Sequence, residues 1–299
     1  METKILKRNS RAENLTAIDK RSNISFKELF KEYIEPEIPV IIKDAVKNWR
    51  GMGKFTPDFF AQHYGDLTEN VKGADYKMVD FVKLMKESTN ENPAPYPFKI
   101  NIENRLPELM ADIRPDVLYG KMDRINHSLL PKFMLNGTDV YEFFFGGKGA
   151  SFPFLHYDAL FMHTQITQIY GAKEFIFYSP DQTKFLYPTE ENPKFSPINV
   201  LNPDYEKFPL FKQAREIRCT VEEGETLFFP TGWWHTTQIH EPCITMGRAQ
   251  LNSSNWKDFV EDNYRLWKHL HPNYTKLGIP VKMYATLLGK VMSLQEKFL

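Results

Sequence analysis

The hydrophobic and polar positions divide the first part of the chain into a polar start and a mixed segment. Residues 1 to about 20 are mostly polar and predict a loosely held arm. The stretch SFKELFKEYI has apolar residues at helical spacing, and the short, β-branched run IPVIIKDAV is typical of a buried strand. In TPDFFAQHYG, Thr56 followed by Pro57 predicts the start of another helix. We therefore expect residues 21–129 to form an α/β segment.

From about residue 130 the pattern changes to short strands rich in Phe, Ile and Thr, with Gly and Pro between them. The clearest are VYEFFFGG, FMHTQITQIYG, KEFIFYSP, REIRCTVEEG, ETLFFPTG and CITMGRAQL. Strands of this length and spacing are typical of a β-sandwich or barrel, which we predict for residues 130–254. From Asn255 helical periodicity returns, so residues 255–299 are predicted to form helices that pack on the β domain or make a dimer contact.

Composition narrows the class of protein. Hydrophobic residues make up 42% of the 299 residues and aromatic residues 14%, which is enough for a packed core. Basic and acidic residues both number 38, so the net charge gives no global attraction to nucleic acid or anionic lipid. No apolar run is long enough to span a bilayer, and the first residues lack the apolar stretch of a signal peptide. We therefore expect a soluble, cytoplasmic protein with no membrane partner and no strong signal for nucleic acid, although a local basic groove is compatible with the zero net charge.

His156, Asp158 and His235 are the candidate metal ligands. The two cysteines are too few for a disulfide framework or a four-sulfur zinc site, so histidine and carboxylate must hold any metal. Because alternate residues of an extended strand share a face, His156 and Asp158 are expected to point the same way. This pair alone is weak evidence for a metal site, since chance supplies about 0.4 His-x-Asp triplets in a chain of this size. His235, at the end of ETLFFPTGWWH where a strand meets a turn, completes a set of two histidines and one carboxylate. This set is the ligand chemistry of non-haem Fe(II) oxygenases, although Zn, Mn or Co could also occupy it.

Lys173 is a further candidate because it stands between two predicted strands. A lysine that points into an apolar strand face needs an anionic partner, since an unpaired buried ammonium costs several kcal/mol. A bound dicarboxylate would supply that partner. The position is equally compatible with a lysine at a strand start whose stem is buried and whose ammonium lies in solvent.

With these residues placed, the segment from Phe144 to Trp234 resembles the JmjC or cupin-like family of Fe(II)- and 2-oxoglutarate-dependent oxygenases. The resemblance lies in FLHYD, QIYGAKEFIFYSPDQTKFLYP, NPDYEKFPLF and EEGETLFFPTGWWH, and with the upstream IPVIIKDAVKNWRGMGKFTPDFFAQHYGD it covers about residues 25–255. Within the family, the chain looks most like the asparaginyl hydroxylases that act on hypoxia-inducible factor. The resemblance implies a mainly β fold with helical additions, a double-stranded β-helix or jelly roll. It also implies that His156, Asp158 and His235 bind Fe(II), and that Lys173 pairs with the far carboxylate of 2-oxoglutarate.

By the same resemblance, Thr164 and Asn101 correspond to cosubstrate contacts, and Ile166 to a contact with cosubstrate or substrate. Trp234 is large enough to form either the core or a wall of the substrate pocket. His163 is one residue out of phase with Thr164, which favours packing behind the sheet over a fourth ligand.

The chain departs from the family pattern near both histidines. Many members have Thr or Ser three residues before the first ligand histidine, where this chain has Pro153. Many also have Asn 14 or 15 residues after the second, where this chain has Ala249 and Gln250. The cosubstrate contacts and the selection of a substrate side chain are therefore expected to differ.

The leading functional hypothesis is an oxygenase that uses Fe(II), O2 and 2-oxoglutarate to hydroxylate a protein side chain or a small molecule, releasing succinate and CO2. The first alternative is a cupin-like isomerase or hydrolase that uses Zn or Mn as a Lewis acid, which would need the triad but not Lys173. The second is a binding module that keeps the fold without turnover. We also expect a homodimer through the helices after Asn255, because their apolar stripes exceed what one barrel covers and the resemblance implies such a contact.

Overall fold

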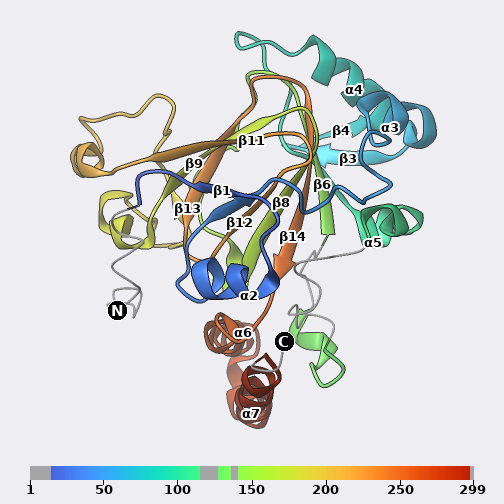
Figure 1. Ribbon diagram of the computed structural model, residues 1–299. Coiled ribbons are helices and arrows are strands. Elements are labelled where there is room, and N and C mark those ends of the chain that lie inside the picture. Colours follow the sequence, from blue (N-terminus) through green and yellow to red (C-terminus); the bar gives the residue numbers. More distant parts are fainter. Residues whose placement is uncertain (1–14, 115–126, 136–140, 297–299) are drawn as a thin grey trace.

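Two facing β-sheets form the centre of the molecule in the computed structural model, which describes residues 15–114, 127–135 and 141–296 (Figure 1). The seven-stranded sheet contains, in spatial order, β1 (Asp19–Arg21), β2 (Val40–Ile42), β12 (Thr226–Phe229), β8 (His163–Tyr170), β14 (Cys243–Gln250), β6 (Tyr141–Gly146) and β5 (Phe98–Asn101). The five-stranded sheet contains β10 (Phe195–Ser196), β7 (Leu155–His156), β13 (Trp234–Gln238), β9 (Lys173–Tyr178) and β11 (Ile217–Val221). Neighbouring strands are antiparallel except for β1 and β2. The predicted jelly roll with helical additions is therefore confirmed.

Helices and a small hairpin surround these sheets. The α-helices are α2 (Phe26–Leu29), α3 (Pro57–Tyr64), α4 (Met78–Glu87), α5 (Ile102–Arg105), α6 (Trp256–Leu270) and α7 (Gly278–Glu296). A π-helical turn, η2 (Phe30–Ile34), continues α2, and β3 (Thr68–Val71) pairs with β4 (Ala74–Lys77). The 3-10 helices are η3 (Pro107–Ile113), η4 (Lys132–Leu135), η5 (Ala159–Phe161), η6 (Pro180–Phe185), η7 (Pro209–Gln213) and η8 (Pro272–Leu277).

The segment before residue 130 contributes strands to the large sheet. β2 pairs with β12, and β5 pairs with β6, so both are integral to that sheet. α3 begins as the sequence predicts: the side chain of Thr56 accepts a hydrogen bond from the backbone N–H of Phe59, and Pro57 is the first helical residue. Most of the predicted polar arm lies outside the described residues, and its last residues, from Asp19, belong to β1.

An aromatic cluster fixes α3 to the outer face of the large sheet. The ring of Phe60 on α3 lies 5.4 Å from that of Phe143 and 4.9 Å from that of Phe145, in edge-to-face geometry on β6. Each such pair contributes about 0.5–1.5 kcal/mol beyond the area it buries. Because Phe143 and Phe145 point outward, the intervening Phe144 points between the sheets.

The space between the sheets is only partly filled. A cluster that includes Ile41, Phe177, Leu227 and Trp233 packs between the two sheets. Beside it the inward-facing residues surround a cavity instead of closing on one another. This cavity contains the candidate site.

The C-terminal helices stand together beyond one end of the sheets (Figure 1). α6 packs against α7, and the indole N–H of Trp256 donates a 2.8 Å hydrogen bond to the carbonyl of Ala285. α6 also contacts η5, the turn that follows Asp158. Within the described residues, none of the helices combines the length and apolar character that crossing a bilayer requires.

Candidate metal centre and ligand cavity

His156 and His235 come together because β7 and β13 are neighbours. The two residues are direct partners across the strands, and their ring centroids are 4.4 Å apart. Each Nδ1 faces a backbone carbonyl two residues earlier in the chain, at 3.3 Å from Phe154 O for His156 and 3.0 Å from Trp233 O for His235. A carbonyl can only accept, so Nδ1 carries the proton and Nε2 keeps its lone pair.

Asp158 supplies the third donor to the same point. Its Oδ1 lies 3.7 Å from Nε2 of His156 and 3.9 Å from Nε2 of His235. Its other oxygen, Oδ2, accepts a hydrogen bond from the hydroxyl of Thr164 on β8, which fixes the orientation of the carboxylate. The three ligand atoms lie within 4.8 Å of one another, so one divalent ion could contact all of them.

The electrostatics of these residues suit a metal. Burial, followed by the proximity of His235, lowers the pKa of His156 to about 3, so this imidazole is neutral at physiological pH. Metal ions bind the neutral form of histidine and the ionised form of aspartate. Two imidazole nitrogens and one carboxylate fit Fe(II), and they leave adjacent coordination positions open.

The triad lines a cavity of about 590 Å³ that also contains Lys173. Lys173 is the first residue of β9, and only 2% of its surface is exposed. Its Nζ donates a 2.9 Å hydrogen bond to the hydroxyl of Tyr96 and lies 5.2 Å from the centre of the Tyr96 ring. Within the described ranges, no carboxylate forms an ion pair with it. Burial raises the pKa of Tyr96, against the opposing effect of Lys173, so the phenol is a neutral partner.

Several cavity walls were not anticipated from the sequence. The ring of Phe144 on β6 lies 5.9 Å from the Lys173 ammonium, and Thr237 on β13 and Thr245 on β14 add hydroxyl groups to the lining. Gly247 on β14 leaves room for Phe144, since a Cβ there would lie 2.8 Å from Cε2 of that ring. The cavity thus combines one cation, hydroxyl groups and aromatic walls.

The predicted site residues divide into those inside and those outside the cavity. The triad, Lys173, Thr164 and Ile166 all line it. Asn101 does not line it; its side chain accepts a hydrogen bond from the backbone N–H of Asn104 and caps α5.

Trp234 lies on the opposite face of β13 from His235, where its indole N–H donates a 2.9 Å hydrogen bond to Thr183 Oγ1. His163 packs outside the cavity, as predicted, with its ring within hydrogen-bond distance of Ser254 and Thr231.

Sequence reasoning could have found one of the missed residues. Once His235 is placed on a strand, Thr237 follows from alternation, because residues two apart share a face. The sequence pattern predicts that His235 lies where a strand meets a turn, and in the structure it is the second residue of β13, directly after that turn. Tyr96 lies in a proline-rich loop without periodicity, and only the fold brings it to Lys173.

The chain is similar in sequence to several known proteins. The chain is 34% identical over 146 residues to HSPB1-associated protein 1 of Rattus norvegicus, covering 42% of this chain and 29% of that protein. It is 25% identical over 252 residues to lysine-specific demethylase JMJ21 of Arabidopsis thaliana, covering 80% of this chain and 26% of the relative. It is 24% identical over 266 residues to the human bifunctional peptidase and (3S)-lysyl hydroxylase JMJD7, covering 73% of this chain and 78% of that protein. The chain thus spans less than a third of the length of the first two relatives.

The family comparison covers most of the residues that build both sheets and the cavity, from before β2 to within β14. The sequence model of the family described as the cupin-like domain matches residues 26–248, a range that includes the triad and Lys173. The relatives include JmjC-type hydroxylases and demethylases. This chain belongs to the cupin-like domain family, in a JmjC-type form with a His-Asp-His triad.

Proposed function

We propose that this protein is an Fe(II)- and 2-oxoglutarate-dependent oxygenase that hydroxylates a protein side chain. The observation that carries the proposal is the buried ammonium of Lys173, which lines the same cavity as the triad. Its hydrogen-bond partner is the neutral hydroxyl of Tyr96, so the cation lacks a counter-charge within the described residues. A dicarboxylate bound with one end at the triad would supply that charge.

Seven of the cavity residues have a role in this proposal. His156, His235 and Asp158 would hold the metal, and the hydroxyl of Thr164 keeps the carboxylate of Asp158 turned toward it. Lys173 and Tyr96 would bind the far carboxylate of 2-oxoglutarate, with Lys173 as the charged donor. The aromatic wall at Phe144 excludes water and so strengthens that interaction.

A bound ferrous ion would supply adjacent open positions for the 2-oxoacid group and for O2. The overall reaction consumes a substrate C–H bond, O2 and 2-oxoglutarate, and it yields the alcohol, succinate and CO2. One oxygen atom enters the new hydroxyl and the other enters succinate. The chain itself contributes binding, orientation and exclusion of water.

The names of the relatives guide the choice of substrate. One is described as a (3S)-lysyl hydroxylase, and others as lysine-specific and arginine-specific demethylases. The sequence resemblance points instead to asparaginyl hydroxylases. The range of candidates supports a protein side chain as the target, so peptides with a central Lys, Arg or Asn are the first to test.

The proposal is tested with the purified full chain, Fe(II), ascorbate, O2 and 2-oxoglutarate, by measuring succinate and by searching the peptides for a 16 Da gain. Succinate that requires both Fe(II) and Lys173, together with a hydroxylated peptide, would establish the function. Turnover of a substrate with Zn or Mn and no 2-oxoglutarate would favour the isomerase or hydrolase. Tight binding of 2-oxoglutarate without succinate would favour the binding module.

A further inference from the structure

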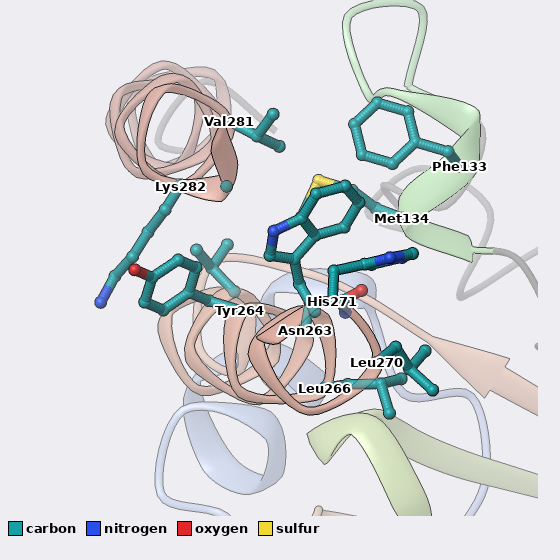
Figure 2. Close-up of a pocket in the computed structure, with 12 residues that line it drawn as sticks. Phe133, Met134, Asn263, Tyr264, Leu266, Leu270, His271, Val281 and Lys282 are labelled. Atoms are coloured by element: carbon teal, nitrogen blue, oxygen red, sulfur yellow. The ribbon is translucent and has the colours of Figure 1, made fainter. Parts of the chain in front are cut away.

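Two hollows in the described part of the chain differ in their chemistry. Figure 2 shows one of them, a space of about 420 Å³ between α6, α7 and η4, with Phe133, Leu266, Leu270 and Val281 around it. Its lining is mostly apolar and offers little to select a charged ligand. The cavity at the triad, in contrast, has charged side chains in its wall that the proposed reaction does not use. These side chains can select the substrate.

Glu142 and Lys99 form an ion pair in the wall of the cavity at the triad. Both residues line that cavity, and Nζ of Lys99 lies 2.7 Å from Oε1 of Glu142. Glu142 is on β6, and Lys99 is on β5, the neighbouring strand at the edge of the large sheet. Among the described residues that line the cavity, Glu142 is the only acidic one apart from the proposed metal ligand Asp158. The pair is therefore a charged feature that neither the metal nor 2-oxoglutarate requires.

The register of the large sheet places Glu142 to one side of the triad. Glu142 pairs with Gly247 of β14, and Gly247 pairs with Ile166 of β8, so the three residues form one row across the sheet. Because neighbouring strands are about 4.8 Å apart, the Cα atom of Glu142 lies roughly 10 Å from that of Ile166. Glu142 is also outside the triad, whose ligand atoms lie within 4.8 Å of one another. A group held at Glu142 is therefore beside the reacting centre and not at it.

Lys99 is the exchangeable member of the ion pair. Its side chain is 45% exposed, whereas that of Glu142 is 17% exposed. An ion pair with a lysine this exposed contributes little to stability, so Lys99 can turn into solvent at low cost. Glu142 has no such freedom, because a largely buried carboxylate without a partner is costly. A substrate cation that replaces Lys99 is therefore favoured over a substrate anion that replaces Glu142.

Arg248 also borders the cavity, but its charge is directed elsewhere. It stands on β14 between Gly247 and Ala249, which face the cavity, so its side chain leaves the opposite face of the sheet. There its guanidinium lies 5.1 Å from the centre of the Tyr141 ring. With Asp158 bound to a metal, Glu142 is the acidic group in the described lining that remains for a substrate.

We propose that Glu142 selects a basic substrate side chain, lysine or arginine, by pairing with its terminal cation in place of Lys99. This inference rests on the proposed oxygenase function and uses the same reaction and co-reactants. The aromatic rings of Phe144 and Phe152, which also line the cavity, suit the methylene stem of such a side chain. Because the cation is held beside the triad, the carbon that reaches the metal is a methylene of the stem and not a methyl group on the terminal nitrogen.

The test measures binding, by calorimetric titration, to the full chain loaded with Fe(II) and 2-oxoglutarate in the absence of O2. The probes are five-residue peptides, blocked at both ends, that differ only in a central lysine, norleucine or glutamate. The wild type should bind the lysine peptide about tenfold more tightly than the norleucine peptide. Glu142→Gln should bind the two equally, whereas Lys99→Gln should bind the lysine peptide several-fold more tightly than the wild type does, because it removes the competing ammonium. The matched control is Glu69→Gln, which changes a 21% exposed carboxylate paired with Arg105 outside the cavity and should keep the wild-type ratio.

The opposite signs of the two variants separate substrate selection from a merely structural ion pair, which would give both variants the same effect. Three results would each overturn the inference: no binding of the lysine peptide, equal binding of lysine and norleucine peptides by the wild type, or a preference for the glutamate peptide. If Glu142→Gln fails to fold, the wild-type ratio and Lys99→Gln decide, and a Lys99→Gln variant that does not gain affinity counts against the inference.

A separate measurement of succinate distinguishes this inference from the proposed function. Selective binding of the lysine peptide by a wild type that makes no succinate would support the role of Glu142 and remove the oxygenase. Succinate production with equal binding of all three peptides would support the oxygenase and remove the role of Glu142.

Discussion

His156 and His235 face each other directly across β7 and β13, with their ring centroids 4.4 Å apart and each Nδ1 turned to a backbone carbonyl. The sheet register, and not a local motif, therefore sets the separation of the two nitrogen donors. Asp158 follows two residues after His156 and reaches the same point from the loop side. A metal site assembled in this way is pre-formed by the strands, because both imidazoles are already oriented by their backbone carbonyls.

Asp158→Ala should abolish metal binding, because it removes the anionic donor and leaves only two imidazoles. We expect the metal content, measured by elemental analysis after loading with Fe(II) or Co(II), to fall from about one ion per chain to near zero. The control is Asp66→Ala, which removes a 96% exposed carboxylate paired with Lys77 and should leave the metal content unchanged. Full metal occupancy in Asp158→Ala would rule out the triad as the binding site.

Lys173→Met should weaken 2-oxoglutarate binding by about ten- to a hundredfold, since a charge-assisted hydrogen bond contributes about 1.5–3 kcal/mol. Methionine keeps much of the apolar stem, so the metal content should stay at the wild-type value. Tyr96→Phe removes only the neutral hydroxyl and should have a smaller, several-fold effect. Calorimetric titration of the metal-loaded protein measures both. Equal affinities in wild type and Lys173→Met would remove the lysine from the cosubstrate site.

Gly247→Ala should lower the affinity for 2-oxoglutarate without affecting the metal. The added Cβ would lie 2.8 Å from Cε2 of Phe144, so this ring, whose centre is 5.9 Å from the Lys173 ammonium, must shift within the cavity wall. Ala249→Gly, on the same inward face of β14, adds space and serves as the comparison. Titration with 2-oxoglutarate should show a loss of several-fold in the first variant only. A loss of equal size in both would mean that β14 flexibility, not the Phe144 ring, determines the affinity.

Both cysteines should be inert in the folded protein. Burial raises the pKa of Cys219 to about 12 and also raises that of fully buried Cys243. A raised pKa favours the neutral thiol, so at pH 8 roughly one Cys219 in 10⁴ is the reactive thiolate, and reactivity grows only as the pH approaches 12. Mass spectrometry after iodoacetamide treatment should find no label on the native chain and two labels after denaturation. Fast native labelling of Cys219 would contradict this.

The sequence predicted the strands well because their alternation and β-branched composition are local properties. The predicted runs around β6, β8, β9, β11, β12 and β14 all contain the observed strands. The C-terminal helices were also predicted, since their apolar spacing is regular. The triad could be proposed because its residue types are unusual in combination, although their approach depends on the pairing of β7 with β13.

The remaining contacts depend on register and loop path, which a single sequence does not specify. Trp234 and His235 are neighbours in sequence, yet only His235 lines the cavity, because the two side chains leave β13 on opposite faces. Asn101 was expected to contact the cosubstrate, but the chain turns into α5 there, and its side chain caps the new helix. Tyr96 contacts Lys173 from a loop 77 residues earlier in the sequence, and no local sequence pattern predicts such a contact.

The shortness of β7 links the resistance of the protein to proteolysis to its metal ion. The strand consists of Leu155 and His156 alone, and it pairs with β13 only at His156. On its other side it pairs with the equally short β10, so backbone hydrogen bonds contribute little to its resistance to local opening. An ion bound by both His156 and His235 would cross-link β7 to β13, and its binding free energy would add to the free energy of local opening. Starvation for the metal would then expose this stretch to proteases, so that the abundance of the protein would follow the metal supply.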